Sequence, residues 1–346
     1  MSPVTFNPLD YALNSRLRFS GGVRAEKAEL FTEIFLFDSL GLPAGDPRRL
    51  DFGDEIVTTR PGEMNETNLL PSANIIYKLN WFQDVLTNLR LSYSHAIARP
   101  SLRELSETLL FDYELNDYVF GNSNLKQVRI KNYDIRWESY FPSTDNISFS
   151  LFYKDFKDHI EMFNTNIGFA WLNVDKSSVA GVEVEGSKKL TKNFSLRSNM
   201  SFVKSQTTFI KLKPEYVTEG LEWVPYGDSI PETRTMLGQA PYVINAILIY
   251  EADSSGWDAA VSYNVQGPKL VLTSTNNAPD IYELPRHMVD VKVSKKFGKH
   301  LSVSLKVRNA LNSPIRRSYN YTEGWLLDFD RYRFGTGYSL GLSYKL

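Results

Sequence analysis

Cysteine is absent from the 346 residues, and only four histidines occur, at positions 95, 159, 287 and 300. The lack of cysteine excludes disulfide bonds, thiolate metal sites and cysteine nucleophiles. No two histidines have the spacing of a zinc motif such as H-x-x-x-H, and no G-x-S-x-G, P-loop or Rossmann motif is found. We therefore predict that the protein is not an enzyme and holds no metal and no cofactor.

An excess of charge of either sign is also missing, because 39 Lys and Arg residues stand against 40 Asp and Glu residues, for a net charge of −1. A protein that binds nucleic acid, or that binds a membrane surface through basic residues, carries a basic excess. We therefore expect no nucleic-acid partner.

Long apolar runs are absent as well. The longest have about five or six residues, whereas a transmembrane helix needs about 18 or more. The mean hydropathy is −0.30, a value that a transmembrane β-barrel shares with soluble proteins because its strands alternate apolar and polar residues. Met1 is not followed by a basic and then an apolar segment, so we identify no signal peptide.

Alternation with a period of two runs along most of the chain and predicts β-strands. In the last segment Tyr338, Leu340, Leu342 and Tyr344 share one face, and small or polar residues occupy the other. No segment shows a comparably long helical period. We predict about twelve strands, at residues 17–36, 68–79, 87–97, 128–141, 146–156, 178–190, 193–209, 234–251, 256–267, 284–297, 300–311 and 333–346.

The predicted connections alternate between long and short. The short ones are rich in turn residues and lie near 80–86, 142–145, 191–192, 252–255 and 298–299. The long ones lie near 38–67, 98–127, 157–177, 210–233, 268–283 and 312–332. This pattern predicts an all-β, antiparallel up-and-down transmembrane β-barrel with short periplasmic turns and long external loops. Soluble all-β proteins also alternate, but their strands are usually shorter, with about 5–6 residues.

Aromatic residues near the strand ends are typical of the girdles of a membrane barrel; examples are Tyr77, Tyr140, Phe194, Trp257 and Tyr344. An Arg or Lys that faces lipid at mid-depth costs roughly 2–4 kcal/mol, so the charged face must line the lumen. We expect its charges mainly to form ion pairs along a hydrated wall. The predicted lumen-facing residues are Arg90, Arg136, Glu138, Glu183, Glu185, Asp290, Lys292 and Arg308.

Six stretches of the chain resemble motifs in the C-terminal barrel of TonB-dependent outer-membrane receptors, and they follow the family's order. The segments are Leu69–Tyr77 (LLPSANIIY), Leu91–Ser101 (LSYSHAIARPS), Gly121–Lys126 with Asn132–Asp134, Gly181–Glu185 (GVEVE), Gln239–Ala246 (QAPYVINA) and Gly337–Leu346. Each motif alone is weakly specific, whereas the ordered set is specific. The style of the motifs resembles that of Bacteroidetes receptors. The sequence departs from the family at Gln127 and Val128, where Pro-Glu is usual, and at Leu346, where Phe is usual.

The resemblance implies a receptor segment in the outer membrane of a Gram-negative bacterium. Family members carry a signal peptide and a plug domain before a 22-strand barrel, so residues 1–346 are similar to the C-terminal part of that barrel, with the plug domain and signal peptide absent. The implied partners are the TonB–ExbB–ExbD complex, through the missing plug, the barrel assembly machinery, through strand 337–346, and outer-membrane lipid.

The resemblance to the family implies that the ligand binds at the long external loops. The implied ligand is bulky and scarce: a ferric siderophore, cobalamin or an oligosaccharide. The loops are rich in aromatic and acidic residues, and aromatic faces suit sugar rings or catecholates. The candidate ligand-binding residues are Tyr113, Asp117, Tyr118, Trp223, Tyr226, Tyr321 and Trp325.

Two other functions stay open from the sequence. The first is a secreted or surface all-β protein that binds glycans without transport activity. The second is a barrel enzyme that uses the neighbouring Asp158 and His159 as an acid–base pair, although such a pair at a surface is usually inert.

Overall fold

A computed structural model describes residues 5–32, 62–81, 83–165, 168–212, 229–275, 279–322 and 325–345. Thirteen strands form one continuous path of neighbours, and each pairs antiparallel with the next. In spatial order they are β1 (Thr5–Ala12), β2 (Leu17–Thr32), β3 (Gly62–Leu79), β4 (Leu86–Ala98), β7 (Val128–Tyr140), β8 (Asn146–Thr165), β9 (Gly168–Lys189), β10 (Phe194–Leu212), β12 (Tyr242–Ala252), β13 (Trp257–Gln266), β16 (Arg286–Phe297), β17 (Leu301–Arg308) and β20 (Gly337–Tyr344).

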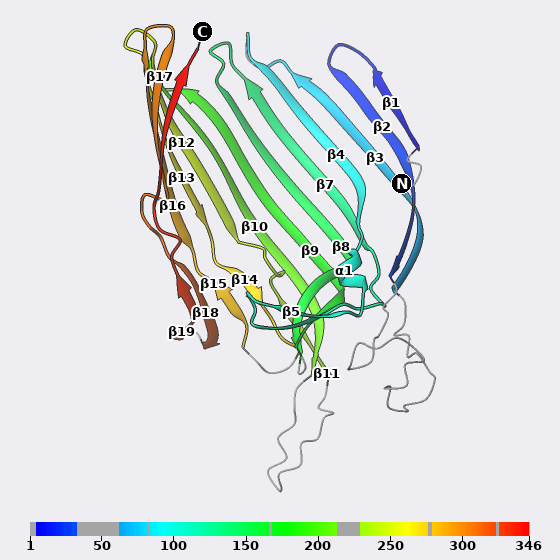
Figure 1. The fold of residues 1–346 in the computed structure, drawn as a ribbon. Helices are drawn as coiled ribbons and strands as arrows, with labels where there is room; N and C mark the ends of the chain where they lie inside the picture. The colour runs from blue at the N-terminus through cyan, green and yellow to red at the C-terminus, as the bar shows by residue number, and fades with distance from the viewer. Residues whose placement is uncertain are drawn as a thin grey trace, which may run out of the picture.

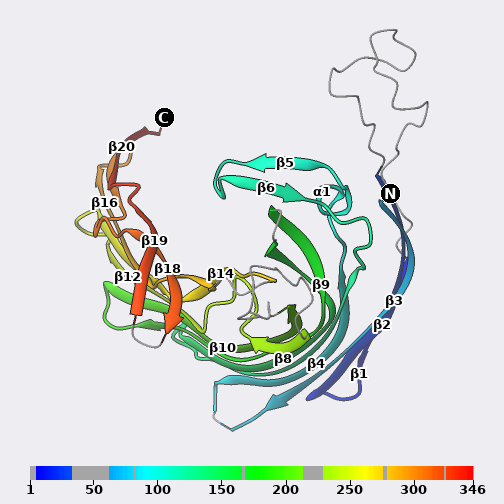
Figure 2. The ribbon, with the colours of Figure 1, turned by 90° about the horizontal axis from the view of Figure 1, so that it is seen from below.

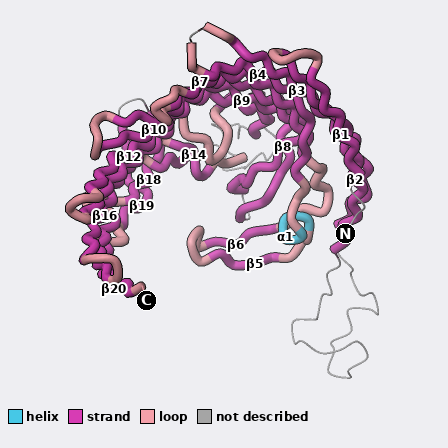
Figure 3. Tube along the Cα trace, turned by 90° about the horizontal axis from the view of Figure 1, so that it is seen from above, coloured by secondary structure: helices cyan, strands magenta, loops and turns pink. Residues whose placement is uncertain are grey.

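The path bends into a curved wall that does not close on itself (Figures 2 and 3). Within the described residues, β1 pairs with β2 and β20 pairs with β17, and these two strands form the edges of the wall. The prediction of an antiparallel up-and-down barrel wall is confirmed as a partial barrel. No helix in the described part of the chain is long and apolar enough to cross a membrane.

All twelve predicted strands correspond to strands of this path, and β1 is an additional one. Pro8 interrupts the sequence pattern of β1, and proline is tolerated there because β1 is an edge strand. The predicted strand 234–251 begins later, at Tyr242. Gly238 ahead of it has a φ of 77°, a left-handed conformation that ends the preceding segment.

The predicted long connection at 157–177 is wrong. β8 and β9 continue their antiparallel pairing from Asn146↔Ser187 up to Thr165↔Gly168, so this hairpin rises well beyond its neighbours. The period of two is interrupted at Asp158, whose φ is 57°, and the pairs on either side are Lys157↔Lys176 and His159↔Val174. A left-handed residue breaks the alternation while the hydrogen-bonded ladder continues.

The two faces of the wall differ as the alternation predicts. On β8, Ile147, Phe149 and Leu151 are 40%, 41% and 43% exposed, whereas the intervening Ser148 and Ser150 are buried. At the C-terminal edge of the wall all residues of β20 are exposed, its four apolar residues among them. A face of exposed apolar side chains suits contact with lipid, and buried polar residues suit the hydrated side.

An aromatic row crosses three neighbouring strands on the apolar face. Tyr93, Tyr133 and Tyr153 are direct register partners on β4, β7 and β8. Their ring centroids lie 5.0 Å and 6.2 Å apart. None of these three residues is among those predicted from the sequence for a girdle, and such a row is typical of the aromatic girdle of a membrane barrel.

The remaining elements all lie at one end of the wall (Figure 1). They are α1 (Leu102–Leu105), β5 (Leu109–Asp112), β6 (Asp117–Phe120), β11 (Ser229–Arg234), β14 (Lys269–Leu272), β15 (Ile281–Glu283), β18 (Ile315–Thr322) and β19 (Trp325–Tyr332). The strands β14, β15, β18 and β19 form a separate loop sheet from two different connections. The hairpin of β5 and β6 folds back across the opening and pairs in parallel with β9. Within the described residues, the predicted long connections at 98–127, 268–283 and 312–332 therefore contain strands of their own, whereas most of 38–67 and 210–233 lies outside the described residues.

Candidate functional site

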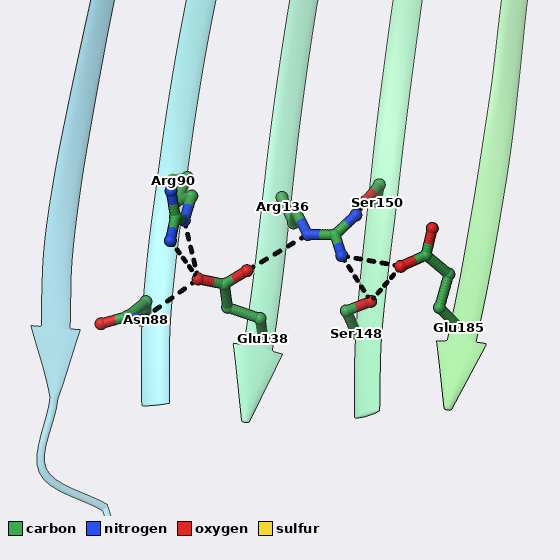
Figure 4. A network of polar contacts seen from close by, with 7 residues as sticks. All are labelled: Asn88, Arg90, Arg136, Glu138, Ser148, Ser150 and Glu185. Atoms are coloured by element: carbon green, nitrogen blue, oxygen red, sulfur yellow. Dashed lines mark hydrogen bonds and ion pairs between the residues drawn. The ribbon is translucent and has the colours of Figure 1, made fainter. Parts of the chain in front are cut away.

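A charged network joins four strands, β4, β7, β8 and β9, on the polar face of the wall (Figure 4). Its centre is Glu138 on β7, whose side chain is 5% exposed. One carboxylate oxygen accepts hydrogen bonds from Arg90 Nε at 2.7 Å and Asn88 Nδ2 at 3.1 Å, and the other accepts one from Arg136 Nε at 3.2 Å. Three donors around one carboxylate compensate for its removal from water.

The network continues through Arg136 to β8 and β9 (Figure 4). Arg136 Nη2 donates to Glu185 at 2.8 Å and to Ser148 Oγ at 2.9 Å, and Arg136 Nη1 donates to Ser150 Oγ at 3.2 Å. Four of the residues predicted to face the lumen, Arg90, Arg136, Glu138 and Glu185, are thus brought together on one face, in the ion-paired arrangement that the sequence suggested.

The other four predicted lumen residues are not part of this network. Glu183 is the register partner of Ser150 on the same polar face. Asp290 accepts a hydrogen bond from the backbone N–H of Asn309 at 2.8 Å and so stabilises the turn after β17. Lys292 and Arg308 lie on β16 and β17, and their assignment to a lumen stays a prediction.

A polar hollow of about 780 Å³ lies beside the network, toward the short turns. Glu185, Arg197, Asn199 and Asn245 line it from β9, β10 and β12. The polar face therefore carries charged and amide side chains at the short-turn end.

Asp158 reverses which face the side chains of β8 meet. Below it the even-numbered residues Ser148 and Ser150 belong to the polar network. Above it the odd-numbered Glu161 and Phe163 are buried, at 2% and 1% exposure. At Asp158, whose φ is positive, the alternation changes phase. Odd-numbered side chains such as Glu161 and Phe163 therefore lie buried beneath the loops.

A buried ion pair fastens the loop carrying β11 to β8. Arg234 NH2 donates to Glu161 at 2.7 Å, and the two side chains are 5% and 1% exposed. The other oxygen of Glu161 accepts the backbone N–H of Leu237 at 2.8 Å. The Arg234 guanidinium lies 5.4 Å and 4.7 Å from the ring centroids of Phe163 and Phe209. The rings therefore form cation–π contacts with the guanidinium, while the Glu161 carboxylate accepts its hydrogen bond.

A small apolar core surrounds this pair. Phe163, Val174 and Phe209 are buried against one another, with Leu172 at their side. The rings of Phe163 and Phe209 are 5.1 Å apart. The charged pair and these rings together form a buried base beneath the loops.

Above this base, five chain segments enclose a cleft of about 260 Å³. Segments distant in sequence meet there, and Asn164 and Ser274 form a bridge between β8 and the loop after β14. The cleft combines aromatic rings with amide, hydroxyl and carboxylate groups, a composition suited to an organic ligand. Its lining residues are Leu115, Asp117, Asn164, Phe169, Leu272, Thr273, Ser274, Pro279, Ile281, Tyr319 and Phe329.

Of the predicted ligand-binding residues, Asp117 lines the cleft. Tyr113, 89% exposed, and Tyr118 both pack edge-on against Phe111 of the same hairpin, at 5.2 Å and 5.4 Å. These two rings therefore pack within their own hairpin.

The remaining four predicted residues cannot be placed with their side chains. Trp223 and Tyr226 lie outside the described residues. Tyr321 and Trp325 belong to the paired strands β18 and β19, but their side chains lie outside the described part. Ligand contact by all seven stays a prediction.

Two titratable groups near the cleft have shifted pKa values. Burial raises the pKa of the Asp280 carboxyl, against a hydrogen bond from Thr273 Oγ1 at 2.9 Å that favours its charged form. Burial also raises the pKa of the Tyr282 phenol, helped by the nearby charge of Asp280. Both residues belong to the loop region, so their burial is a property of loop packing.

Sequence reasoning missed Glu161, Arg234, Phe169 and Phe329. A buried Glu in a strand has no local signature, since its partner Arg234 is 73 residues away. The available signal was the broken alternation at Asp158, where the burial of side chains changes from even to odd positions although the register with β9 is unchanged.

An antiparallel meander with an apolar outer face, an aromatic row and long structured loops at one end has the architecture of an outer-membrane β-barrel. The family model described as "TonB dependent receptor-like, beta-barrel" matches residues 6–310, and the chain belongs to this family. A search of curated proteins found no match.

Several solved structures of similar fold are receptors by their descriptions. The siderophore receptor PiuA from Acinetobacter baumannii has a TM-score of 0.65 at 11% identity, over 99% of this chain and 43% of PiuA. The ferric-catecholate import receptor Fiu from E. coli K12 has a TM-score of 0.60 at 13% identity, over 90% and 40%. The ferric yersiniabactin uptake receptor FyuA from Yersinia pestis has a TM-score of 0.60 at 14% identity, over 99% and 44%.

This chain therefore spans less than half the length of each of these receptors. At these identities the similarity shows the fold. The matched family and the named structures are receptors, which agrees with the expectation of a non-enzymatic protein at this coarse level.

Proposed function

We propose that residues 1–346 form the C-terminal part of the barrel of an outer-membrane receptor that takes up a bulky, scarce ligand. The cleft between the structured loops carries this proposal, because it is the place where aromatic and polar side chains from five segments converge. The sorted faces of the wall support membrane insertion, and the unpaired outer sides of β1 and β20 within the described residues support a larger barrel.

The ligand class follows from the chemistry of the cleft. Tyr319 and Phe329 offer aromatic faces, and Asp117 and Thr273 offer polar contacts. This combination suits a planar or ring-bearing ligand such as a ferric catecholate, with cobalamin and oligosaccharides as the other members of the proposed class. Trp223, Tyr226, Tyr321 and Trp325 are proposed to complete the site from the loops.

Transport requires partners beyond the wall. The polar hollow beside Glu185 offers a hydrated, charged surface against which a plug domain can sit. Energy for uptake then comes from the TonB–ExbB–ExbD complex acting on that plug, and residues 337–346 present an alternating strand to the barrel assembly machinery. We expect the 346-residue chain alone to show ligand binding without energy-dependent uptake.

Binding and membrane location are tested together. The full chain is extracted from membranes in detergent and titrated with a ferric catecholate, cobalamin and maltoheptaose, with tryptophan fluorescence as the readout. We expect binding of one of these probes, weakened at least about tenfold in Asp117→Asn and Phe329→Ala, since each removes a lining contact. Tyr140→Phe, at the short-turn end, is the matched control and retains the affinity.

Two results contradict the proposal. Recovery of the chain only from the soluble fraction excludes the outer-membrane assignment, and binding of maltoheptaose by such a soluble chain favours the glycan-binding alternative. Binding by the membrane form that is unchanged in both cleft variants excludes the cleft as the site.

A further inference from the structure

The apolar face of the wall ends abruptly at the aromatic row toward the loops. On β8 the lipid-side positions run from Ile147 to Tyr153 and are followed by Asp155 and Lys157. On β7 the same change occurs from Tyr133 to Lys131, and Lys131 is the register partner of Asp155. The row of tyrosines thus marks the height at which this face leaves the hydrocarbon region, since tyrosine is enriched at that interface.

Four lysines gather on this face at or just above the tyrosine row, and we call them the lysine cluster: Lys131, Lys157, Lys176 and Lys204. They come from four consecutive strands, β7, β8, β9 and β10, and all are exposed. Lys157 and Lys176 are direct register partners. Neighbouring strands lie about 4.8 Å apart, so the four ammonium groups fall within the width of a few lipid headgroups.

The charges around the lysine cluster do not cancel it. Two register rows hold three of the lysines, and Asp155 is the acidic residue in these rows. The first row consists of His95, Lys131, Asp155, Ser178 and Gln206, and the next of Ile97, Arg129, Lys157, Lys176 and Thr208. Arg129 is turned to Glu66, 3.6 Å away. No ion pair within the described residues involves the four lysines.

The opposite end of the same face carries no such cluster. Toward the short turns, the lipid-side row of Thr87, Ser139, Ile147, Gly186 and Ser198 carries no charge, and one row nearer the turns Lys188 pairs with Leu196. Beside the cluster, on β2 and β3, the matching positions are Val23 and Pro71. On this face four lysines from neighbouring strands therefore gather on the loop side, whereas Lys188 and Lys295 stand singly at the short-turn end.

We propose that the lysine cluster is a binding site for phosphorylated lipid headgroups of the leaflet on the loop side. The proposal rests on the membrane location proposed above. Tyr133 and Tyr153 place the acyl chains below the cluster, and four lysines with one opposing carboxylate supply a net positive charge at headgroup height. An anionic phosphate beside a lysine near a membrane surface is favoured by electrostatic attraction.

Lipid binding is measured on the full chain in detergent by native mass spectrometry, with phosphatidic acid and phosphatidylcholine as the probes. We expect phosphatidic acid to bind at least about tenfold more tightly than phosphatidylcholine. The variant Lys131→Gln, Lys157→Gln, Lys176→Gln and Lys204→Gln loses this preference. The Lys→Arg variant at the same four positions retains it, which separates charge from folding.

A matched control removes four lysines from the polar face: Lys78→Gln, Lys154→Gln, Lys189→Gln and Lys306→Gln. It retains the preference for phosphatidic acid. Raising the salt from about 0.1 M to about 1 M, which shortens the screening length from about 10 Å to 3 Å, weakens binding to the wild-type chain. Excess inorganic phosphate leaves the bound lipid in place, because the acyl chains also contribute.

Three results overturn the proposal: equal binding of both lipids by the wild-type chain, an unchanged preference in the Lys→Gln variant, or an equal loss in the polar-face control. Displacement of the lipid by inorganic phosphate overturns the commitment to a lipid. Each of these outcomes is independent of the cleft titration, so the failure of the lipid site and the failure of the proposed receptor function are distinguishable.

Discussion

Strand β8 has two halves, separated by Asp158, in which opposite sets of positions, even or odd, face the inside. In the lower half, residues 146–157, even-numbered side chains face the polar network and odd-numbered ones face outward. In the upper half, residues 159–165, the odd-numbered Glu161 and Phe163 are buried beneath the loops. A single left-handed residue, with φ of 57°, therefore converts a membrane wall into the base of a loop cluster.

The two halves also hold charge differently. Glu138, the centre of the lower network, contacts Arg90 and Arg136, whose side chains are 42% and 32% exposed. Glu161, in the upper half, contacts Arg234, and both are almost fully buried. Solvent screens the first set and not the second, so the same substitution has a smaller effect in the lower half.

The largest effect is expected for the upper ion pair. Glu161→Leu leaves the Arg234 charge buried without a partner, which costs about 3–5 kcal/mol. Replacing both residues, as in Glu161→Leu with Arg234→Leu, restores most of this loss because no charge stays buried. The measurement is the urea midpoint of the detergent-solubilised chain.

An exposed pair serves as the control. Lys27 and Glu29 are 54% and 62% exposed, and Lys27→Leu changes stability by less than about 1 kcal/mol. If the double variant is as unstable as Glu161→Leu alone, the cost does not come from the uncompensated charge.

The next largest effect tests whether the odd positions of the lower half meet lipid. Leu151→Arg places a charge within the apolar band and costs about 2–4 kcal/mol, whereas Tyr153→Arg, at the aromatic row, costs about 0–1 kcal/mol. Both residues are 43% exposed, so exposure alone predicts equal effects. Urea unfolding from phosphatidylcholine vesicles measures the difference, and equal costs would place both residues at the same depth.

The lower half of β8 is predictable from the sequence, and the upper half is not. The alternation from Ile147 to Tyr153 assigns each face without knowledge of any partner, and it places Glu138 and Glu185 on the same side. Above Asp158 the outcome depends on contacts with β11 and the loops, such as Glu161 with Arg234, 73 residues apart. No local period encodes such contacts, and the same holds for the cleft, where Asp117, Phe169 and Tyr319 meet.

A smaller effect is expected in the lower network. Glu138→Gln keeps the shape of the side chain but weakens its hydrogen bonds to Arg90 and Arg136, at a cost of about 1–3 kcal/mol. Glu183→Gln, on the same face, is the control and changes stability little. A loss for Glu138→Gln as large as that for Glu161→Leu would show that the lower network is equally shielded from solvent.

Asp158 itself gives a way to sharpen the comparison. Asp158→Ala costs about 1 kcal/mol because alanine disfavours a positive φ, and Asp158→Gly is tolerated. Since the chain lacks cysteine, single substitutions such as Phe149→Cys and Phe163→Cys report the faces directly. We expect a lipid-soluble maleimide to label position 149, and position 163 to be protected from all maleimides. Labelling at both positions would mean that the alternation does not reverse.

The smallest effect concerns the pH dependence of the loops above β8. Burial raises the pKa of Asp280 above its value in the unfolded chain, so the neutral carboxyl is the form that the folded loops favour. The associated stability is fully present below the unfolded pKa, near 3.9, and is lost as the pH rises through the folded pKa. Asp280→Asn removes this loss, and we expect the variant to resist proteolysis of the loops better than the wild-type chain at neutral pH but not at acidic pH. A greater sensitivity of the variant at neutral pH would show that the hydrogen bond from Thr273 to the charged carboxylate outweighs its burial, and that the loop base, like the lower wall, accommodates charge through its partners.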